Sequence, residues 1–182
     1  MDLEIGRLDQ ELEDSVAAGL ERIGVPASAD WRRPVHSTTI SLLNLASVCL
    51  FTDYVARLEG FANSAAALGH TRFQHLPLWQ MSIWLPVLFQ PPREPTISTE
   101  GWPVFLGSCQ CLLAELAEIQ QLSEMELGAT PDGYEAMRAD YIAFVRSGFA
   151  LRDDRSIIQW IWRGLHDGAE LAIRDSVPLL GM

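Results

Sequence analysis

Apolar residues recur at helical spacing over much of the chain. In residues 3–24 they lie three or four positions apart, and acidic residues fall between them. The apolar positions are Ile5, Leu8, Leu12, Val16, Leu20 and Ile23. This period is that of an amphipathic helix, and Gly24 followed by Pro26 is a combination that ends helices. The segment therefore predicts a first helix with an acidic outer face.

Two further segments carry a helical pattern with more apolar character. Residues 38–59 are apolar around nearly the whole circumference of a helix, which is typical of a central, buried helix. Residues 103–123 again show one apolar face, and Pro103 suits the first turn of a helix because its missing N–H is not needed there.

The C-terminal part predicts two more helices. Asp132 is followed by Glu135 three residues later, a spacing that resembles a capping box at a helix start. The last helix is expected to begin near Asp154 or Ser156 and to end at Pro178.

Residues 76–98 follow a different period. From Trp79 to Leu85 every second residue is apolar, and the other face carries Gln80 and Ser82, which is a strand pattern. Nearby prolines would confine such a strand to an edge or to strand ends. The predicted fold class is therefore mainly α: one compact domain over residues 1–182, with about five to six helices and a short β-strand or hairpin within 76–98.

Charge is strongly negative and unevenly distributed. The chain has 24 acidic and 13 basic residues, a net charge of −11, and all of its basic residues are arginine. The net negative charge is concentrated in 1–30 and in 101–129, which contains no basic residue. Such a field repels nucleic acid, whose phosphates bind clustered basic residues, and it attracts basic partners. The absence of lysine also excludes Schiff-base and P-loop chemistry.

Catalytic motifs are missing from the sequence. No phosphate-binding glycine loop occurs, and Gly107-Ser108 lacks both the second glycine of a nucleophile elbow and a predicted strand before it. Cys109 and Cys111 are separated by one residue, which is shorter than the usual zinc or redox spacing. We therefore assign no catalytic residue, no metal ligand and no cofactor, and we expect a binding protein rather than an enzyme.

His166 supports an alternative function, the binding of a metal ion or small molecule. His166 and Glu170 are four residues apart on the last predicted helix, so they share a face and could contact one metal ion. Catalytic zinc uses about three protein ligands, and no third is fixed by spacing. The alternative function is a small enzyme, or a metal- or small-molecule-binding protein, with a pocket between helices and a loop histidine as third ligand.

The leading functional prediction is a protein–protein interaction module. Tryptophans cluster around the proline-rich segment 76–103, and tryptophan is enriched at interface hot spots. The predicted contacts are Trp79, Trp84 and Trp102 as anchors, with Glu11, Asp14, Glu115 and Glu118 steering the partner. The most concrete form is a bacterial immunity or antitoxin-type inhibitor that neutralises a basic toxin or effector.

A third alternative is a chaperone or a subunit of a larger assembly, in which the apolar stripe of residues 5–23 pairs with a partner helix. The start of the chain lacks the pattern of a signal peptide. The most apolar stretch, Ile40 to Phe51, is about twelve residues, whereas a membrane span needs about 20. We therefore expect a cytoplasmic protein without membrane contact, for which a homo-oligomer stays open.

Overall fold

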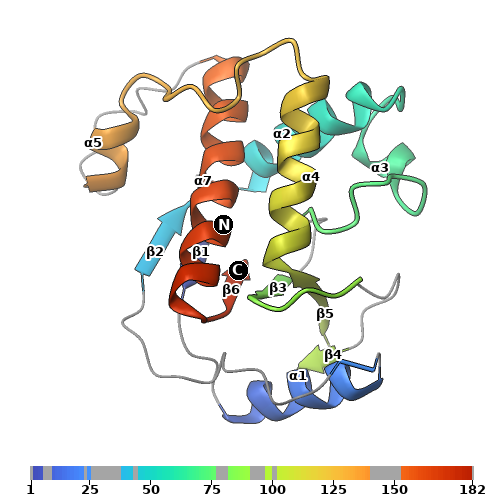
Figure 1. Cartoon of the computed structure of the whole chain (residues 1–182). Coiled ribbons are helices and arrows are strands. Elements are labelled where there is room, and N and C mark those ends of the chain that lie inside the picture. The colour runs from blue at the N-terminus through green and yellow to red at the C-terminus, as the bar shows by residue number, and fades with distance from the viewer. Residues whose placement is uncertain are drawn as a thin grey trace.

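The computed structural model describes most of the chain as helices and strands around one sheet (Figure 1). The described residues are 2–5, 10–22, 24–25, 38–42, 45–76, 82–90, 97–99, 102–139 and 153–181.

Among the described residues, the sheet has six strands in the order β2-β1-β6-β3-β5-β4. They are β1 (Asp2–Ile5), β2 (Thr38–Ser41), β3 (Ser82–Leu85), β4 (Ile97–Thr99), β5 (Trp102–Ser108) and β6 (Leu179–Gly181). Neighbouring strands are antiparallel except β3 and β5, which run parallel with Trp84 opposite Gly107. The N-terminal and C-terminal strands, β1 and β6, pair side by side in the middle of the sheet.

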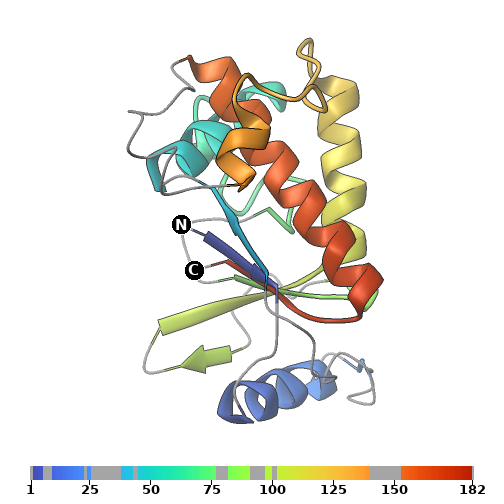
Figure 2. The same cartoon turned by 90° about the vertical axis from the view of Figure 1, so that its left-hand side faces the viewer.

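Helices lie on both faces of this sheet. They are α1 (Gln10–Arg22), α2 (Leu45–Leu58), α3 (Ser64–Ala67), α4 (Cys109–Leu122), α5 (Tyr134–Ala139) and α7 (Asp154–Asp175). Figure 2 shows α2, α4 and α7 above the sheet and α1 alone below it. The molecule thus has three layers, and the lower layer of described structure is a single helix.

Strand β3 divides the core into two clusters because successive side chains of a strand point to opposite faces. Trp84 belongs to the larger cluster with apolar residues of α2, α4 and α7. Its neighbours Ile83 and Leu85 belong to the second cluster, together with Val16 and Leu20 of α1. The apolar stripe of α1 is therefore covered by the protein's own sheet, contrary to the predicted pairing with a partner helix.

The mainly α prediction is confirmed, since helices account for more of the described residues than strands do. Strands also occur within 76–98 as predicted, but β3 and β4 do not form a hairpin, because β5 lies between them.

Three of the predicted helices begin later along the chain in the structure than the prediction placed them. The segments 3–24, 38–59 and 103–123 each include a strand, namely β1, β2 and β5, before the helix begins. Pro103 lies in β5, opposite Ser98 of the outermost strand β4, and not in a helical first turn. No described helix combines the length and the apolarity that crossing a bilayer requires.

Candidate functional site

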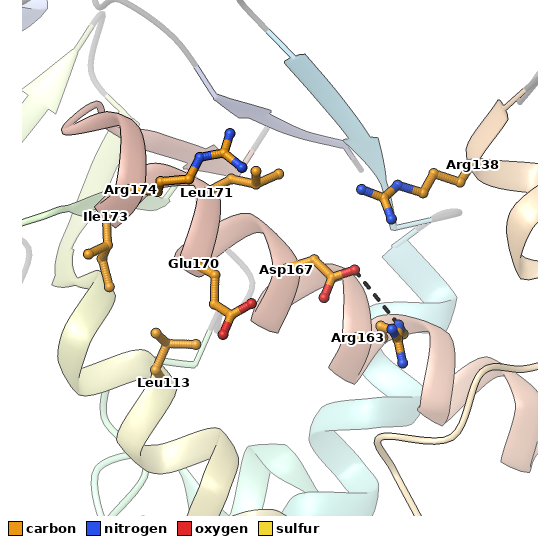
Figure 3. A pocket seen from close by; sticks show the side chains of 8 residues that line it. All are labelled: Leu113, Arg138, Arg163, Asp167, Glu170, Leu171, Ile173 and Arg174. Carbon is orange, nitrogen blue, oxygen red and sulfur yellow. Dashed lines mark ion pairs between the residues drawn. The ribbon is translucent and has the colours of Figure 1, made fainter.

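A cavity of about 610 Å³ lies between α4, α5 and α7 (Figure 3). Its wall combines aliphatic side chains with three arginines and two carboxylates. The lining residues are Leu113, Arg138, Arg163, Asp167, Glu170, Leu171, Ile173 and Arg174. In a chain of net charge −11, a cavity with more cationic than anionic side chains is a local exception.

Three potential metal ligands meet on α7 at one side of this cavity. His166, Asp167 and Glu170 each offer one ligand atom, and these atoms all lie within 4.8 Å of one another. The imidazole Nδ1 of His166 is 3.6 Å from Oδ1 of Asp167 and 3.8 Å from Oε2 of Glu170. At about 100° per residue, positions i, i+1 and i+4 of a helix fall within one sector of about 100°, which explains the convergence.

Asp167 is held by neighbours from α5 and α7. The hydroxyl of Tyr134 donates a hydrogen bond of 2.7 Å to Oδ2. Arg163 Nε lies 3.8 Å from the same oxygen, an ion pair drawn in Figure 3. Burial alone would raise the pKa of Asp167, but hydrogen bonds from His166 and Tyr134 and the charge of Arg163 outweigh it and lower the pKa. The carboxylate is therefore ionised, with one oxygen directed at His166.

The imidazole of His166 is also fixed in orientation. It stacks on the indole of Trp162, with ring centroids 4.9 Å apart and an interplanar angle of 18°. Trp162 is buried and donates a hydrogen bond of 3.0 Å from Nε1 to the carbonyl of Leu116 in α4. Packing between α4 and α7 thus determines where the histidine points.

The predicted metal ligands of the alternative function were His166 and Glu170, with a loop histidine as the third. The third ligand atom comes from Asp167, the residue next to His166, and its orientation depends on Tyr134 and Arg163. The helical spacing could have indicated Asp167, whereas nothing in the sequence pointed to Tyr134.

Of the three predicted tryptophan anchors, the structure describes the side chain of one, Trp84. Trp84 is 0% exposed, and its Nε1 donates a hydrogen bond of 2.7 Å to the carbonyl of His75. It offers no surface to a partner, so its predicted contact role is wrong in this structure. Trp79 lies outside the described residues, and of Trp102 only the backbone, at the start of β5, is described.

The two predicted acidic contacts on α4 each interact with another part of the chain. Glu115 accepts hydrogen bonds from the backbone N–H of Gln74 at 2.8 Å and from that of His75 at 2.9 and 3.1 Å. Burial raises the pKa of Glu115 to about 8, although these N–H groups act in the opposite direction. Glu118 lies 3.0 Å from Arg72 in a partly exposed ion pair. Both carboxylates thus have partners within the molecule, and their role in steering a protein partner stays a prediction.

The acidic residues predicted on the first helix lie on the surface. Glu11 and Asp14 are exposed on α1, and Asp14 accepts a hydrogen bond of 3.0 Å from the side chain of Gln10. Glu21, further along α1, is exposed as well. Glu13 is buried instead and belongs to the inner face.

Ser108 is the last residue of β5 and the N-cap of α4, so a strand does precede it, contrary to the prediction. Ser108 is nevertheless buried, and its hydroxyl accepts the N–H of Cys111 as the N-cap of α4. Its own N–H donates to Nδ1 of His75 at 3.0 Å. These contacts give Ser108 a structural role rather than that of a nucleophile.

Comparison with known proteins adds no relative: no family model matches the chain, and neither a curated protein nor a solved structure does.

Proposed function

We propose that this chain is an interaction protein that binds a basic protein partner, in its most concrete form a bacterial immunity or antitoxin-type inhibitor. The observation that supports the proposal is an acidic stripe on the outer face of α1, formed by Glu11, Asp14 and Glu21. The wider net charge of −11 would add long-range attraction for a basic partner and speed its encounter.

The acidic stripe follows from helical geometry. At about 100° per residue, its three members lie within about 80° of one another around the helix. Ten residue steps separate the first from the last, which is about 15 Å along the axis at 1.5 Å per residue. Among the described residues, none of the three carboxylates forms an ion pair with an arginine. Their charge therefore remains available to a partner.

The opposite face of α1 makes this surface rigid. Val16 and Leu20 are 0% exposed and pack against Ile83, Leu85 and Leu106 of the sheet. A surface held in place before binding loses little conformational freedom when a partner docks. The acidic stripe thus has the pre-organisation that a specific contact needs.

A cytoplasmic location belongs to the same proposal. All three cysteines, Cys49, Cys109 and Cys111, are free. Free thiols, one of them buried and two partly exposed, suit a reducing compartment, where disulfides are rare.

The experiment uses the protein encoded next to this chain in its genome as the probe. The two chains are co-expressed and purified, and their affinity is measured at several salt concentrations. Replacing Glu11, Asp14 and Glu21 with Gln, Asn and Gln should weaken binding by about tenfold or more, because close charge pairs at an interface contribute more than 1 kcal/mol in total. Affinity should also fall as salt rises.

The matched control changes the same amount of charge elsewhere. Glu124, Glu126 and Glu135 are exposed and lie outside α1, and their replacement with glutamine alters the net charge equally. Affinity of this control should stay within about threefold of the wild type, since distant exposed charges are screened. Equal losses in both triple variants, or no binding of the neighbouring protein, would contradict the proposal.

A metal- or small-molecule-binding protein is the second candidate. One observation favours it: two members of the cluster of His166, Asp167 and Glu170, namely Asp167 and Glu170, line the cavity between α4, α5 and α7.

A further inference from the structure

We propose that His166, Asp167 and Glu170 bind one divalent transition-metal ion of the zinc class at the edge of the cavity between α4, α5 and α7. This site is independent of the acidic stripe on α1, because it lies on the other side of the sheet (Figure 2).

The spacing of the ligand atoms fits such an ion. Zinc binds histidine nitrogen and carboxylate oxygen at about 2.0–2.2 Å, so a tetrahedral site separates its ligand atoms by about 3.4 Å. Nδ1 of His166 is 3.6 Å from Oδ1 of Asp167 and 3.8 Å from Oε2 of Glu170. Closing these two distances to the tetrahedral value needs movements of a few tenths of an ångström, and closing the third, between the two carboxylate oxygens that lie within 4.8 Å of each other, needs up to about 1.4 Å. Glu170 is exposed and free to make them.

The type of ligand selects the class of metal. One imidazole with two carboxylates suits zinc and its first-row neighbours, whereas calcium and magnesium prefer oxygen ligands alone. A neutral imidazole and two carboxylates carry a charge of −2, which balances a divalent ion. With three protein ligands, the site resembles the zinc sites that keep a fourth position open.

Two of the three ligands are oriented before any ion binds. Tyr134 and Arg163 both contact Oδ2 of Asp167, which leaves Oδ1 directed at His166. The ring of His166 is stacked on Trp162. Outer partners of this kind fix metal ligands and typically change metal affinity by about 10–100-fold when removed.

The nearby arginines limit the affinity of this site for a metal ion. Arg163 lies 3.8 Å from Oδ2 of Asp167, and Arg138 is close enough to lower the pKa of that carboxyl. Arg174 is engaged by Asp175, whose two oxygens it contacts at 2.7 and 2.9 Å. Because these cations oppose a metal ion, we expect weaker binding than at a four-ligand structural zinc site.

The test is calorimetric titration of the full chain with Zn²⁺ after treatment with a chelator. One ion should bind per chain. His166→Ala and Glu170→Gln should each weaken binding by at least about tenfold, because each removes one of three ligands. Tyr134→Phe, which deletes only the hydroxyl behind Asp167, should weaken it by about tenfold. The matched control is His70→Ala, since His70 is exposed and lies outside the cluster; its affinity should equal that of the wild type.

Titration with Co²⁺ tests the donor set without relying on affinity. Nitrogen and oxygen ligands give visible d–d absorption without a thiolate charge-transfer band, and this spectrum should vanish in His166→Ala. A thiolate band would assign the ion to a cysteine and overturn the proposal. So would the absence of binding, or Zn²⁺ binding that both His166→Ala and Glu170→Gln leave unchanged. Circular dichroism of each variant verifies that the fold is retained.

Discussion

The indole of Trp84 donates a hydrogen bond of 2.7 Å to the backbone carbonyl of His75, and both residues are buried. The imidazole of His75 in turn accepts the N–H of Ser108 at 3.0 Å. His75 also gives its own N–H to Glu115 of α4. These contacts join strand β3, the loop that carries His75, and the junction of β5 with α4.

Trp84→Phe should destabilise the fold. The substitution leaves the carbonyl of His75 buried without its donor, a loss of about 1–3 kcal/mol, and it also removes packed volume. Urea unfolding followed by circular dichroism measures the change. Tyr54→Phe is the control, because the Tyr54 hydroxyl contacts Ser123 at 2.6 Å in a part-buried position where water can replace it. An equal loss in both variants would contradict the special role of the buried bond.

Gly107→Ala should also destabilise the protein, because β5 approaches Trp84 closely at this point. A Cβ on Gly107 would lie 2.5 Å from Cδ1 and 2.9 Å from Nε1 of the buried indole. We expect a loss of about 2 kcal/mol or more, as for other overpacked cores. Gly128→Ala is the control, since its nearest contact would be 3.8 Å from Trp162. Its unfolding midpoint in urea should stay close to that of the wild type; a midpoint for Gly107→Ala as high as this control would refute the clash.

Acid should destabilise the fold through His75. Burial lowers the pKa of His75 to about 4, whereas the unfolded chain takes up this proton near pH 6.5. The unfolded state therefore binds more protons between these values, and stability falls as the pH drops from about 6.5 to about 4. The full effect is about 3 kcal/mol, from 1.36 kcal/mol per pKa unit.

His75→Asn tests this assignment, because an amide oxygen can accept the N–H of Ser108 but does not titrate. Free energies of unfolding measured from pH 4 to pH 7 should fall less steeply with acid in this variant than in the wild type. His70→Asn, at an exposed position, should keep the wild-type slope. Identical slopes in all three proteins would rule His75 out as the source.

Glu115 should have the opposite pH dependence. Burial raises its pKa to about 8, so in the folded protein it stays protonated over a range in which the unfolded chain has already released the proton. Its contribution to stability is fully present below about pH 4.5 and is lost as the pH rises toward 8.

Glu115→Gln keeps an oxygen that accepts the N–H groups of Gln74 and His75. The variant should be at least as stable as the wild type at pH 7, and its relative advantage should grow from pH 4.5 to pH 8. Glu118→Gln, which removes only a partly exposed ion pair with Arg72, serves as the control. A clear loss of stability in Glu115→Gln at neutral pH would mean that the charge-assisted bonds outweigh burial.

The sequence by itself determined where most helices run. Long apolar stripes need only local spacing, so the amphipathic character of α1 and the extent of α7 could be predicted from it. The same spacing placed Glu11 and Asp14 on an exposed face and His166 beside Glu170. These are relations within one helix, for which the backbone hydrogen bonds are local.

Only the tertiary structure decided which segments became strands and which side chains were covered. Strand β1 pairs with β2 and with β6 from the far end of the chain, so its partners are invisible to any local pattern. The alternating pattern placed Trp84 on one face of its strand, but it did not reveal that helices cover that face. Likewise Glu115 has the helical position of a solvated acid, but it is half-buried and accepts two N–H groups from a loop distant in the sequence. Burial and strand pairing depend on contacts between residues far apart in the sequence. Such contacts form only when the layers of the fold pack together.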